Sequence, residues 1–205
     1  MTPADERRLG VLISGRGSNL QALIDAHAAG TLGGAVVVVV SNVAGAAGLE
    51  RARAKGIAAH TCEHRGLPRA DHEALVLELL RAARVDLVCL AGYMRLLSAA
   101  FVQQAGVPIL NVHPSLLPSF PGLEAQRQAL EHGVKVSGAT VHLVDAGLDA
   151  GPIVMQEAVP VKDDDSTETL AARILEAEHH IFPRAVRLVL SGRYRVDGRR
   201  VVAAE

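Results

Sequence analysis

The 205-residue chain is 49% hydrophobic and 21% charged, so it can bury one sizeable core and is too apolar for wholesale disorder. Its net charge of -1 and aromatic content of 2% argue against a nucleic-acid partner, because phosphate backbones need basic surfaces and single strands stack on aromatic rings. No apolar run approaches the roughly twenty residues of a membrane span, and no signal peptide is recognisable. We therefore expect a cytoplasmic protein without a membrane partner, whose two cysteines, Cys62 and Cys89, are reduced.

Apolar runs typical of strands alternate with helical patterns through the first half of the chain. The expected strands are residues 9–14, 36–41, 59–62, 87–91 and 109–112, and the expected helices are 19–29, 48–55, 69–83 and 98–104. This alternation predicts a parallel sheet covered by crossover helices on both faces. Ligands should gather at the carboxyl ends of its strands.

The pattern changes in the second half. Residues 135–144 alternate between apolar and polar side chains, and 153–161 follow across a glycine-rich turn region, which predicts a hairpin-like extension of the sheet. The expected fold class is therefore α/β and Rossmann-like, in a single domain over residues 1–205. Its twisted sheet should be mostly parallel, with helices on both faces and mixed strand directions toward the C-terminal half.

A long helix and a hairpin close the chain. The apolar periodicity over 166–190 predicts the helix, with Asp165 and Glu168 as its N-terminal capping pair and a bend at Pro183. The tail should then form a hairpin of type I′ around Asp197-Gly198.

A glycine-rich turn, Ser14-Gly15-Arg16-Gly17-Ser18-Asn19-Leu20, joins the first strand to the first helix. Free backbone N–H groups and the positive helix end can hold an anion there, and Ser18 and Asn19 can cap the helix or bind phosphate oxygens. An ordinary turn capped by Ser18 would explain the same residues. The leucine at position 20 disfavours NAD, and the absence of a Lys-Ser/Thr pair disfavours nucleotide triphosphates. A terminal phosphate on a small substrate fits better.

A second candidate site follows the fifth strand, in Leu110-Asn111-Val112-His113-Pro114. Their spacing of two places Asn111 and His113 on one face of a strand, where an amide and an imidazole could stabilise the oxyanion of acyl transfer. Asp149 lies in a tight turn, and if it meets His113 it should favour the imidazolium and raise the histidine pKa. The alternatives are a structural Asn and His at a strand end and an Asp that only orders its turn.

The remaining polar clusters predict no further site. His142 alternates with apolar neighbours, and it is either a polar residue near the site or, as we prefer, a hydrogen-bonded sheet histidine. The run 163–165 is best explained as a solvated helix start. No metal site is expected, because the other histidines lie on different elements or face apart, as for His60, His64, His72, His179 and His180.

Four segments agree in order and spacing with the motifs of one family. They are residues 15–20, Ala91-Gly92-Tyr93-Met94-Arg95-Leu96-Leu97, residues 111–118 and residues 148–152. Together they resemble the phosphoribosylglycinamide formyltransferases, the folate-dependent transformylases of purine synthesis, over nearly the whole chain. The resemblance implies transfer of a formyl group from 10-formyltetrahydrofolate to the amine of N1-(5-phosphoribosyl)glycinamide in de novo IMP synthesis. It implies small-molecule partners, no metal, and either a monomer or a homodimer.

The resemblance also implies the role of each matching residue. His113 should donate a proton to the oxyanion, Asn111 should be the second donor, and Asp149 should keep His113 charged. Gly17, Ser18 and Asn19 match the segment that binds the substrate phosphate, and Glu178 matches a substrate-binding glutamate near the glycinamide end. The expected folate-binding residues are Arg69, Met94, Arg95, Leu96, Leu97, Asn111, Asp145 and Asp149. Residues 1–105 would form the phosphate-substrate half, 106–192 the folate and catalytic half, and 193–203 a C-terminal hairpin.

One position departs from the family pattern, because Glu124 stands where many relatives carry histidine. This departure puts the pH response of its loop in doubt. Methionyl-tRNA formyltransferase and formyltetrahydrofolate deformylase share part of the motifs, but each should carry a further domain for which 205 residues leave no room. A non-catalytic folate- or phosphometabolite-binding protein is the alternative from another class, and the intact Asn111, His113 and Asp149 argue against it.

Overall fold

The computed structural model describes residues 6–204, which contain nine strands and six helices. The strands are β1 (Arg7–Ile13), β2 (Gly34–Ser41), β3 (Ala58–Thr61), β4 (Leu87–Leu90), β5 (Ile109–His113), β6 (Val136–Leu143), β7 (Ile153–Pro160), β8 (Tyr194–Asp197) and β9 (Arg200–Ala203). The helices are α1 (Ser18–Ala28), α2 (Ala47–Arg53), α3 (Arg69–Ala82), α4 (Ala99–Ala105), α5 (Ala125–Glu131) and α6 (Thr167–Ser191).

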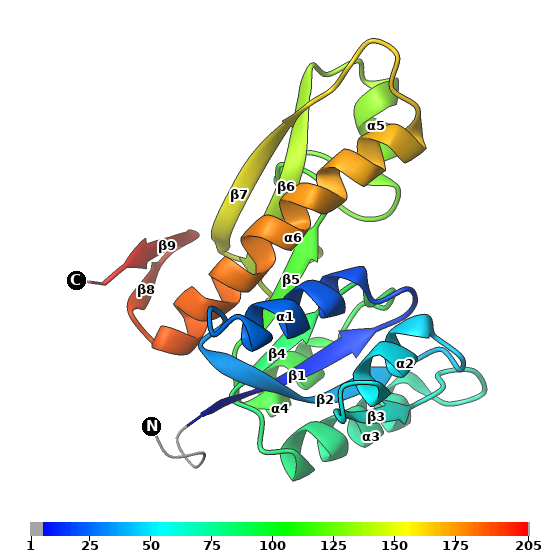
Figure 1. Ribbon diagram of the computed structural model, residues 1–205, viewed down its shortest axis with the longest axis vertical. Coiled ribbons are helices and arrows are strands. Elements are labelled where there is room, and N and C mark those ends of the chain that lie inside the picture. The colour runs from blue at the N-terminus through cyan, green and yellow to red at the C-terminus, as the bar shows by residue number, and fades with distance from the viewer. Residues whose placement is uncertain (1–5, 205) are drawn as a thin grey trace.

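All nine strands form one sheet in the order β3-β2-β1-β4-β5-β6-β7-β9-β8 (Figure 1). Strands β1 to β5 pair in parallel, whereas β6 pairs antiparallel with both β5 and β7. This arrangement confirms the expected mixed, Rossmann-like sheet. Strands β6 and β7 are joined by a short connection without a crossover, so they pair antiparallel as a hairpin. This hairpin extends the sheet beyond its parallel half.

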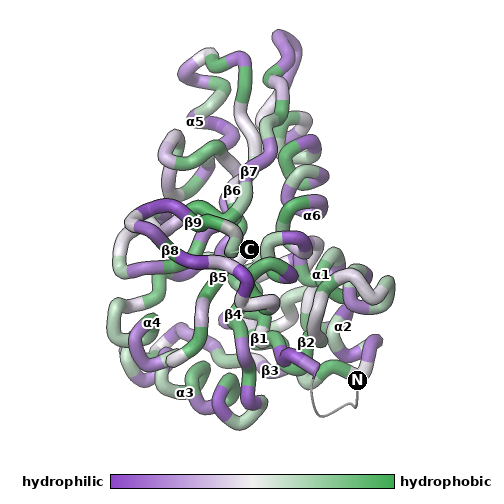
Figure 2. Tube along the Cα trace, turned by 90° about the vertical axis from the view of Figure 1, so that its left-hand side faces the viewer, coloured by the Kyte–Doolittle hydropathy of each residue, from purple (hydrophilic) through white to green (hydrophobic). Residues whose placement is uncertain are grey.

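The core has two layers, one on each face of the sheet. Leu9, Val11 and Ile13 of β1 pack in the larger cluster with α1, α2 and α6, while Leu12 packs in the smaller one with α3 and α4. This alternation follows from the period of two along a strand. In Figure 2 the interior strands are largely hydrophobic, and the turn between β8 and β9 is hydrophilic. Within residues 6–204, no helix is long and apolar enough to cross a membrane.

Helix α6 is the longest element, and its N-terminal cap lies one residue later than expected. The Ser166 hydroxyl accepts a hydrogen bond from the Thr169 N–H at 3.3 Å, and the Thr169 hydroxyl accepts one from the Ser166 N–H at 2.9 Å. Ser166 therefore replaces the predicted pair of Asp165 and Glu168 as the cap, because Asp165 is engaged by Arg173. The helix continues through Pro183 to its end.

Two further local predictions were wrong or incomplete. The turn of the β8–β9 hairpin is Gly198-Arg199, since Asp197 pairs with Arg200, and of these two turn residues only Gly198 has a positive φ, at 59°. That is the pattern of a type II′ turn and not of type I′. Helix α5 was not predicted, because it has seven residues and buries only Ala125 and Ala129, which gives little periodic signal.

Candidate active site

Strands β5 and β6 place the predicted catalytic residues in one cluster. Asn111 of β5 lies opposite His142 of β6 in the antiparallel register, and its amide nitrogen is 3.1 Å from the His142 Nε2. The Asp149 carboxylate lies between the two histidines, with Oδ2 3.5 Å from the His113 Nδ1 and Oδ1 3.6 Å from the His142 Nε2. The structure thus brings Asn111, His113 and Asp149 together.

The turn that carries Asp149 is fixed by its backbone. Asp149 adopts a left-handed conformation with φ 48°, which Asp and Asn tolerate better than most residues. Its Oδ2 accepts a hydrogen bond from the Gly122 N–H at 2.8 Å. A Cβ at Gly151 would lie 1.9 Å from the Leu143 carbonyl oxygen, so the chain can return against β6 only with glycine there. The sequence Asp149-Ala150-Gly151 therefore holds the carboxylate at the histidines.

Burial and charge oppose one another at His113. Burial lowers the pKa of the His113 imidazole below its ordinary value, although the Phe120 carbonyl and the Asp149 carboxylate both raise it. Asp149 thus acts on the His113 pKa in the predicted direction, but desolvation outweighs its charge, so the net shift is downward. Burial also raises the pKa of Asp149, but the bond from the Gly122 N–H and the proximity of the two histidines hold it below the ordinary range. In the free site Asp149 is an anion beside an imidazole that is mostly neutral at pH 7.

His142 belongs to this cluster, although we preferred to place it in the sheet alone. Its Nδ1 lies 3.0 Å from the Leu143 carbonyl and must donate to it, which leaves the Nε2 to accept from the Asn111 amide. His142 thereby fixes the orientation of Asn111 and leaves its second N–H available. His142 is identified by its position opposite Asn111 in the β5–β6 register. The sequence of β6 by itself does not show which residue lies opposite.

The loop after β5 is anchored to β6 and contacts His113. The Thr140 hydroxyl donates to the Ser115 carbonyl at 2.6 Å and accepts from the Leu117 N–H at 3.0 Å. The loop then returns so that the Phe120 carbonyl accepts a hydrogen bond from the His113 Nε2 at 2.9 Å. The Nε2 that would face a substrate oxygen therefore carries a hydrogen and is already bonded to the protein.

The glycine-rich turn after β1 has an open helix start. Gly17 is the N-cap of α1 with φ 72°, and no side chain caps the helix, so the turn capped by Ser18 is not what forms. No acidic residue lies in the first turn. The free N–H groups at this end can bind an anion.

Glu178 lies against this turn and not in the histidine cluster. Its carboxylate accepts a hydrogen bond from the Asn19 amide at 2.7 Å, and both residues are 7% exposed. Burial with this one donor raises the pKa of Glu178 to about 7. The Asn19 Oδ1 is buried and has no partner among the described residues. This buried acceptor can take a hydrogen bond from a donor at the site.

Four of the predicted folate residues, 94–97, form a partly exposed segment after β4. Met94 and Leu96 are 66% and 64% exposed, and the Met94 N–H donates to the Ser14 hydroxyl at 2.8 Å. Arg69 bonds from α3 to the Leu96 carbonyl at 2.7 Å and to Glu73 at 3.0 Å. Arg69 therefore shapes this segment, whatever else it binds.

Two of the other predicted positions lie outside these contacts. Asp145 is exposed and accepts a hydrogen bond from the Gly147 N–H at 2.9 Å, at the start of the turn that leads to Asp149. Glu124 adopts a left-handed conformation with φ 58° and is paired with Arg127. Within residues 6–204, no group of three or more His, Cys, Asp and Glu side chains is placed to hold a metal ion.

Comparisons with known proteins agree with this geometry. A family model described as formyl transferase matches residues 7–186. A phosphoribosylglycinamide formyltransferase of Escherichia coli is 46% identical over 91% of this chain and 88% of its own length. The crystal structure of glycinamide ribonucleotide transformylase 1 from Symbiobacterium toebii has a TM-score of 0.95 and 54% identity, covering 98% of this chain and 95% of that one. The chain belongs to the phosphoribosylglycinamide formyltransferase family.

Some family relatives are far longer. The trifunctional purine biosynthetic protein adenosine-3 of Drosophila melanogaster is 50% identical over 91% of this chain, which spans only 14% of the fly protein. The formyltransferase fold of this family is therefore found both in short proteins and as a part of long ones.

Glu178→Gln should flatten the pH dependence of stability. The pKa of Glu178 is about 7 in the folded protein, above its ordinary value of 4.5. Between these values the folded state binds more protons than the unfolded state, so the unfolding free energy falls as pH rises through this window. Urea denaturation at pH 5 and pH 8 should show this loss reduced in the variant by up to about 3 kcal/mol. The control is Glu176→Gln, at an exposed position of the same helix; equal pH dependence in all three proteins would contradict the assignment.

Glu73→Gln should loosen the exposed segment after β4. The Glu73 carboxylate accepts from Arg69, from the Ser98 N–H at 2.9 Å and from the Ser98 hydroxyl, and these bonds hold its pKa below the ordinary value although burial raises it. Loss of the charged acceptor should lower the unfolding free energy by roughly 1–3 kcal/mol. Hydrogen exchange should accelerate at the amides of 94–98. The exposed Glu78→Gln on the same helix should change neither quantity, and unaltered exchange in Glu73→Gln would refute the role.

Proposed function

We propose that this chain transfers the formyl group of 10-formyltetrahydrofolate to the amine of N1-(5-phosphoribosyl)glycinamide, giving the N-formyl product and tetrahydrofolate in de novo purine synthesis. The observation that carries the proposal is the cluster in which Asp149 contacts both His113 and His142 while His142 fixes Asn111. This cluster lies at the carboxyl end of β5, the edge of an open α/β sheet where ligands bind.

The chemistry follows from what these side chains can donate. As the substrate amine attacks the formyl carbon, a C–N bond forms and negative charge develops on the formyl oxygen. The His113 Nε2–H and the free N–H of Asn111 are the donors for that oxygen. The intermediate collapses by breaking the bond to the folate nitrogen, which gains a proton as the substrate amine loses one. No metal and no covalent enzyme intermediate is needed.

Asp149 makes this step easier by its charge. Growing negative charge on the substrate oxygen favours uptake of a proton from solvent by the His113 imidazole, and the nearby carboxylate stabilises the imidazolium that results. The ring releases this proton to solvent again as the intermediate collapses. A buried neutral imidazole therefore becomes a proton donor when the reaction requires one. The Phe120 carbonyl now holds the His113 Nε2, so the formyl oxygen must replace it as the acceptor.

Two binding regions complete the proposal. The start of α1, with Gly17, Ser18 and Asn19, would hold the substrate phosphate, and Glu178 would bind the substrate beside Asn19. The folate would contact Asn111, Asp149 and the residues Arg69, Met94, Arg95, Leu96, Leu97 and Asp145. We assign 1–105 mainly to the phosphate substrate, 106–192 to the folate and catalysis, and 193–203 to a closing hairpin, in one domain.

The direct test is an assay of the purified protein with 10-formyltetrahydrofolate, with and without N1-(5-phosphoribosyl)glycinamide. Tetrahydrofolate should form only when the amine is present, and no formate should accumulate. Formate release without the amine would replace the proposal with a deformylase. Binding of the folate without any turnover would replace it with a binding protein.

Asp149→Asn should keep the turn, because asparagine tolerates the left-handed conformation, but remove the charge beside His113. Turnover should fall by roughly 10²–10³, the usual cost of one lost oxyanion contribution. Because the carboxylate raises the His113 pKa, its loss should move the His113 titration, followed by NMR, to lower pH. Asp163→Asn, at an exposed site paired with Lys135, is the matched control. Turnover within threefold of the parent would remove Asp149 from the mechanism.

A further inference from the structure

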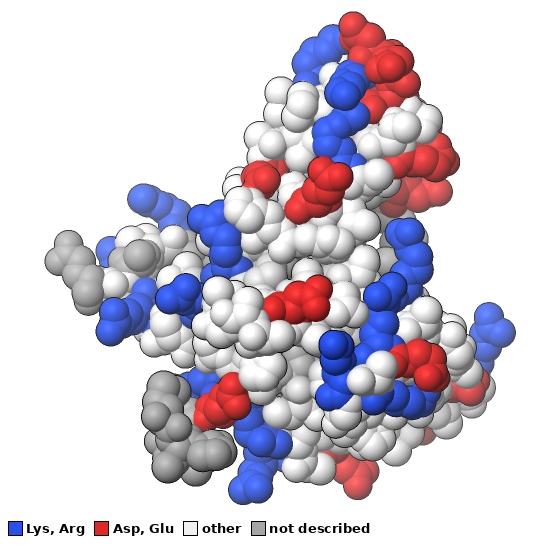
Figure 3. Space-filling view, viewed as in Figure 1, with Lys and Arg blue, Asp and Glu red and all other residues white. Residues whose placement is uncertain are grey.

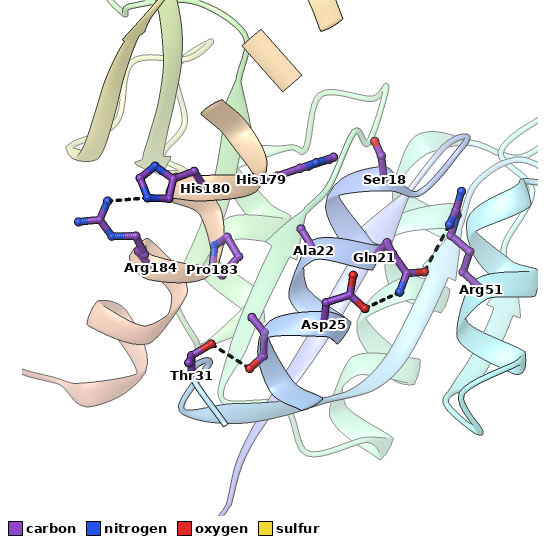
Figure 4. Close-up of a pocket in the computed structure, with 11 residues that line it drawn as sticks. Ser18, Gln21, Ala22, Asp25, Thr31, Arg51, His179, His180, Pro183 and Arg184 are labelled. Atoms are coloured by element: carbon purple, nitrogen blue, oxygen red, sulfur yellow. Dashed lines mark hydrogen bonds between the residues drawn. The ribbon is translucent and has the colours of Figure 1, made fainter. Parts of the chain in front are cut away.

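Arg51 of α2 lies across the glycine-rich turn that follows β1. Its Nε donates to the Arg16 carbonyl at 3.0 Å, and its guanidinium also donates to the Gln21 side-chain oxygen of α1 at 3.3 Å. Figure 4 shows Arg51 reaching from α2 toward Gln21, next to Ser18 at the start of α1. The guanidinium thus lies beside the free N–H groups that open this helix.

Two glycines allow this approach. The Gly48 N–H of α2 donates to the Gly15 carbonyl at 3.0 Å, and a Cβ at Gly17 would lie 2.6 Å from the Gly48 Cα. Side chains at either position would push the start of α2 away from the turn. The close contact of α2 with the turn is what brings Arg51 to the site.

The charge of Arg51 is not compensated by the protein. Among the described residues no carboxylate forms an ion pair with Arg51, whereas Arg53 on the same helix is paired with Glu50. A cation beside the positive end of α1 is electrostatically unfavourable unless an anion lies between them. Basic side chains gather over this region on the face shown in Figure 3. The arrangement therefore favours a bound anion.

Unpartnered buried atoms near this turn point to a ligand. The His179 Nε2 is buried without a partner among the described residues, and as an N–H it can donate to a phosphate oxygen. The unpartnered Asn19 Oδ1 is an acceptor and would take a hydroxyl or amine donor of the same ligand. Ser18, Arg51 and His179 line one groove of about 570 Å³ between α1 and α6, and His179 extends toward Ser18 (Figure 4). The groove gives a small phosphorylated molecule access to the start of α1.

We propose that Arg51 is the side-chain cation of the phosphate site, which holds the substrate phosphate between its guanidinium and the N–H groups at the start of α1. The identity of the substrate rests on the proposed function, but the anion site does not. Arg51 acts in binding and lies apart from the His113 cluster, so its contribution should be to substrate affinity and not to turnover.

The test compares Arg51→Ala and Arg51→Lys with Arg53→Ala, which removes an outward-facing arginine of the same helix. Calorimetry with inorganic phosphate measures the anion site without any reaction. Steady-state kinetics then give kcat and the KM values for N1-(5-phosphoribosyl)glycinamide and for 10-formyltetrahydrofolate. For the substrate analogue that lacks the phosphate, kcat/KM is measured. Circular dichroism and thermal melting confirm that each variant is folded.

Arg51→Ala should weaken phosphate binding and raise the KM for the phosphorylated substrate by about tenfold or more, as expected for a charge-assisted contact. The folate KM and kcat should stay within about threefold of the parent, and Arg51→Lys should recover part of the loss. The substitution should have little effect on the analogue without phosphate, which separates a phosphate contact from support of the turn. Equal phosphate affinity in Arg51→Ala and Arg53→Ala would overturn the proposal. If the parent binds phosphate through Arg51 but transfers no formyl group, the proposed function fails and this inference stands.

Discussion

The antiparallel pairing of β5 with β6 is the constraint on which the site depends. It places Asn111 opposite His142 and His113 opposite Thr140, so that one pair of strands supplies the amide, both imidazoles and the hydroxyl that anchors the following loop. A parallel strand in place of β6 would need a crossover connection and could not return the chain directly to the same edge. The change from parallel to antiparallel pairing therefore creates the cluster as well as extending the sheet.

Much of the fold could be predicted because its signals are local. The apolar runs that became β1, β2 and β4 are buried on both faces, and the spacing of Asn111 and His113 sets their common side without tertiary information. His142 was undervalued because its importance arises from the residue opposite it, which lies 31 positions away. The same applies to the His113 pKa: the Asp149 charge can be anticipated, but the burial that outweighs it arises only in the folded chain.

The local errors have equally physical causes. Asp165, Ser166 and Glu168 can all cap a helix, and the choice of Ser166 is decided by Arg173, which binds Asp165 from the next turns of α6. At the C-terminal hairpin, the register of β8 with β9 moves the turn by one residue, and only glycine at its first position then needs a positive φ. Both are cases in which a side chain or strand elsewhere selects among local options of similar energy.

Two carboxylates, Glu178 and Asp149, show how their surroundings set what a carboxyl group can do. Glu178 receives one hydrogen bond, from Asn19, and burial raises its pKa to about 7, whereas the Gly122 N–H and the two histidines hold Asp149 below its ordinary range. Near neutral pH Glu178 can therefore either donate or accept a hydrogen bond, which suits a group that contacts hydroxyls or amines. Asp149 remains an anion and can support positive charge on His113. Burial acts on both carboxylates and is greater at Glu178, while the Gly122 N–H and the histidines beside Asp149 reverse its effect there.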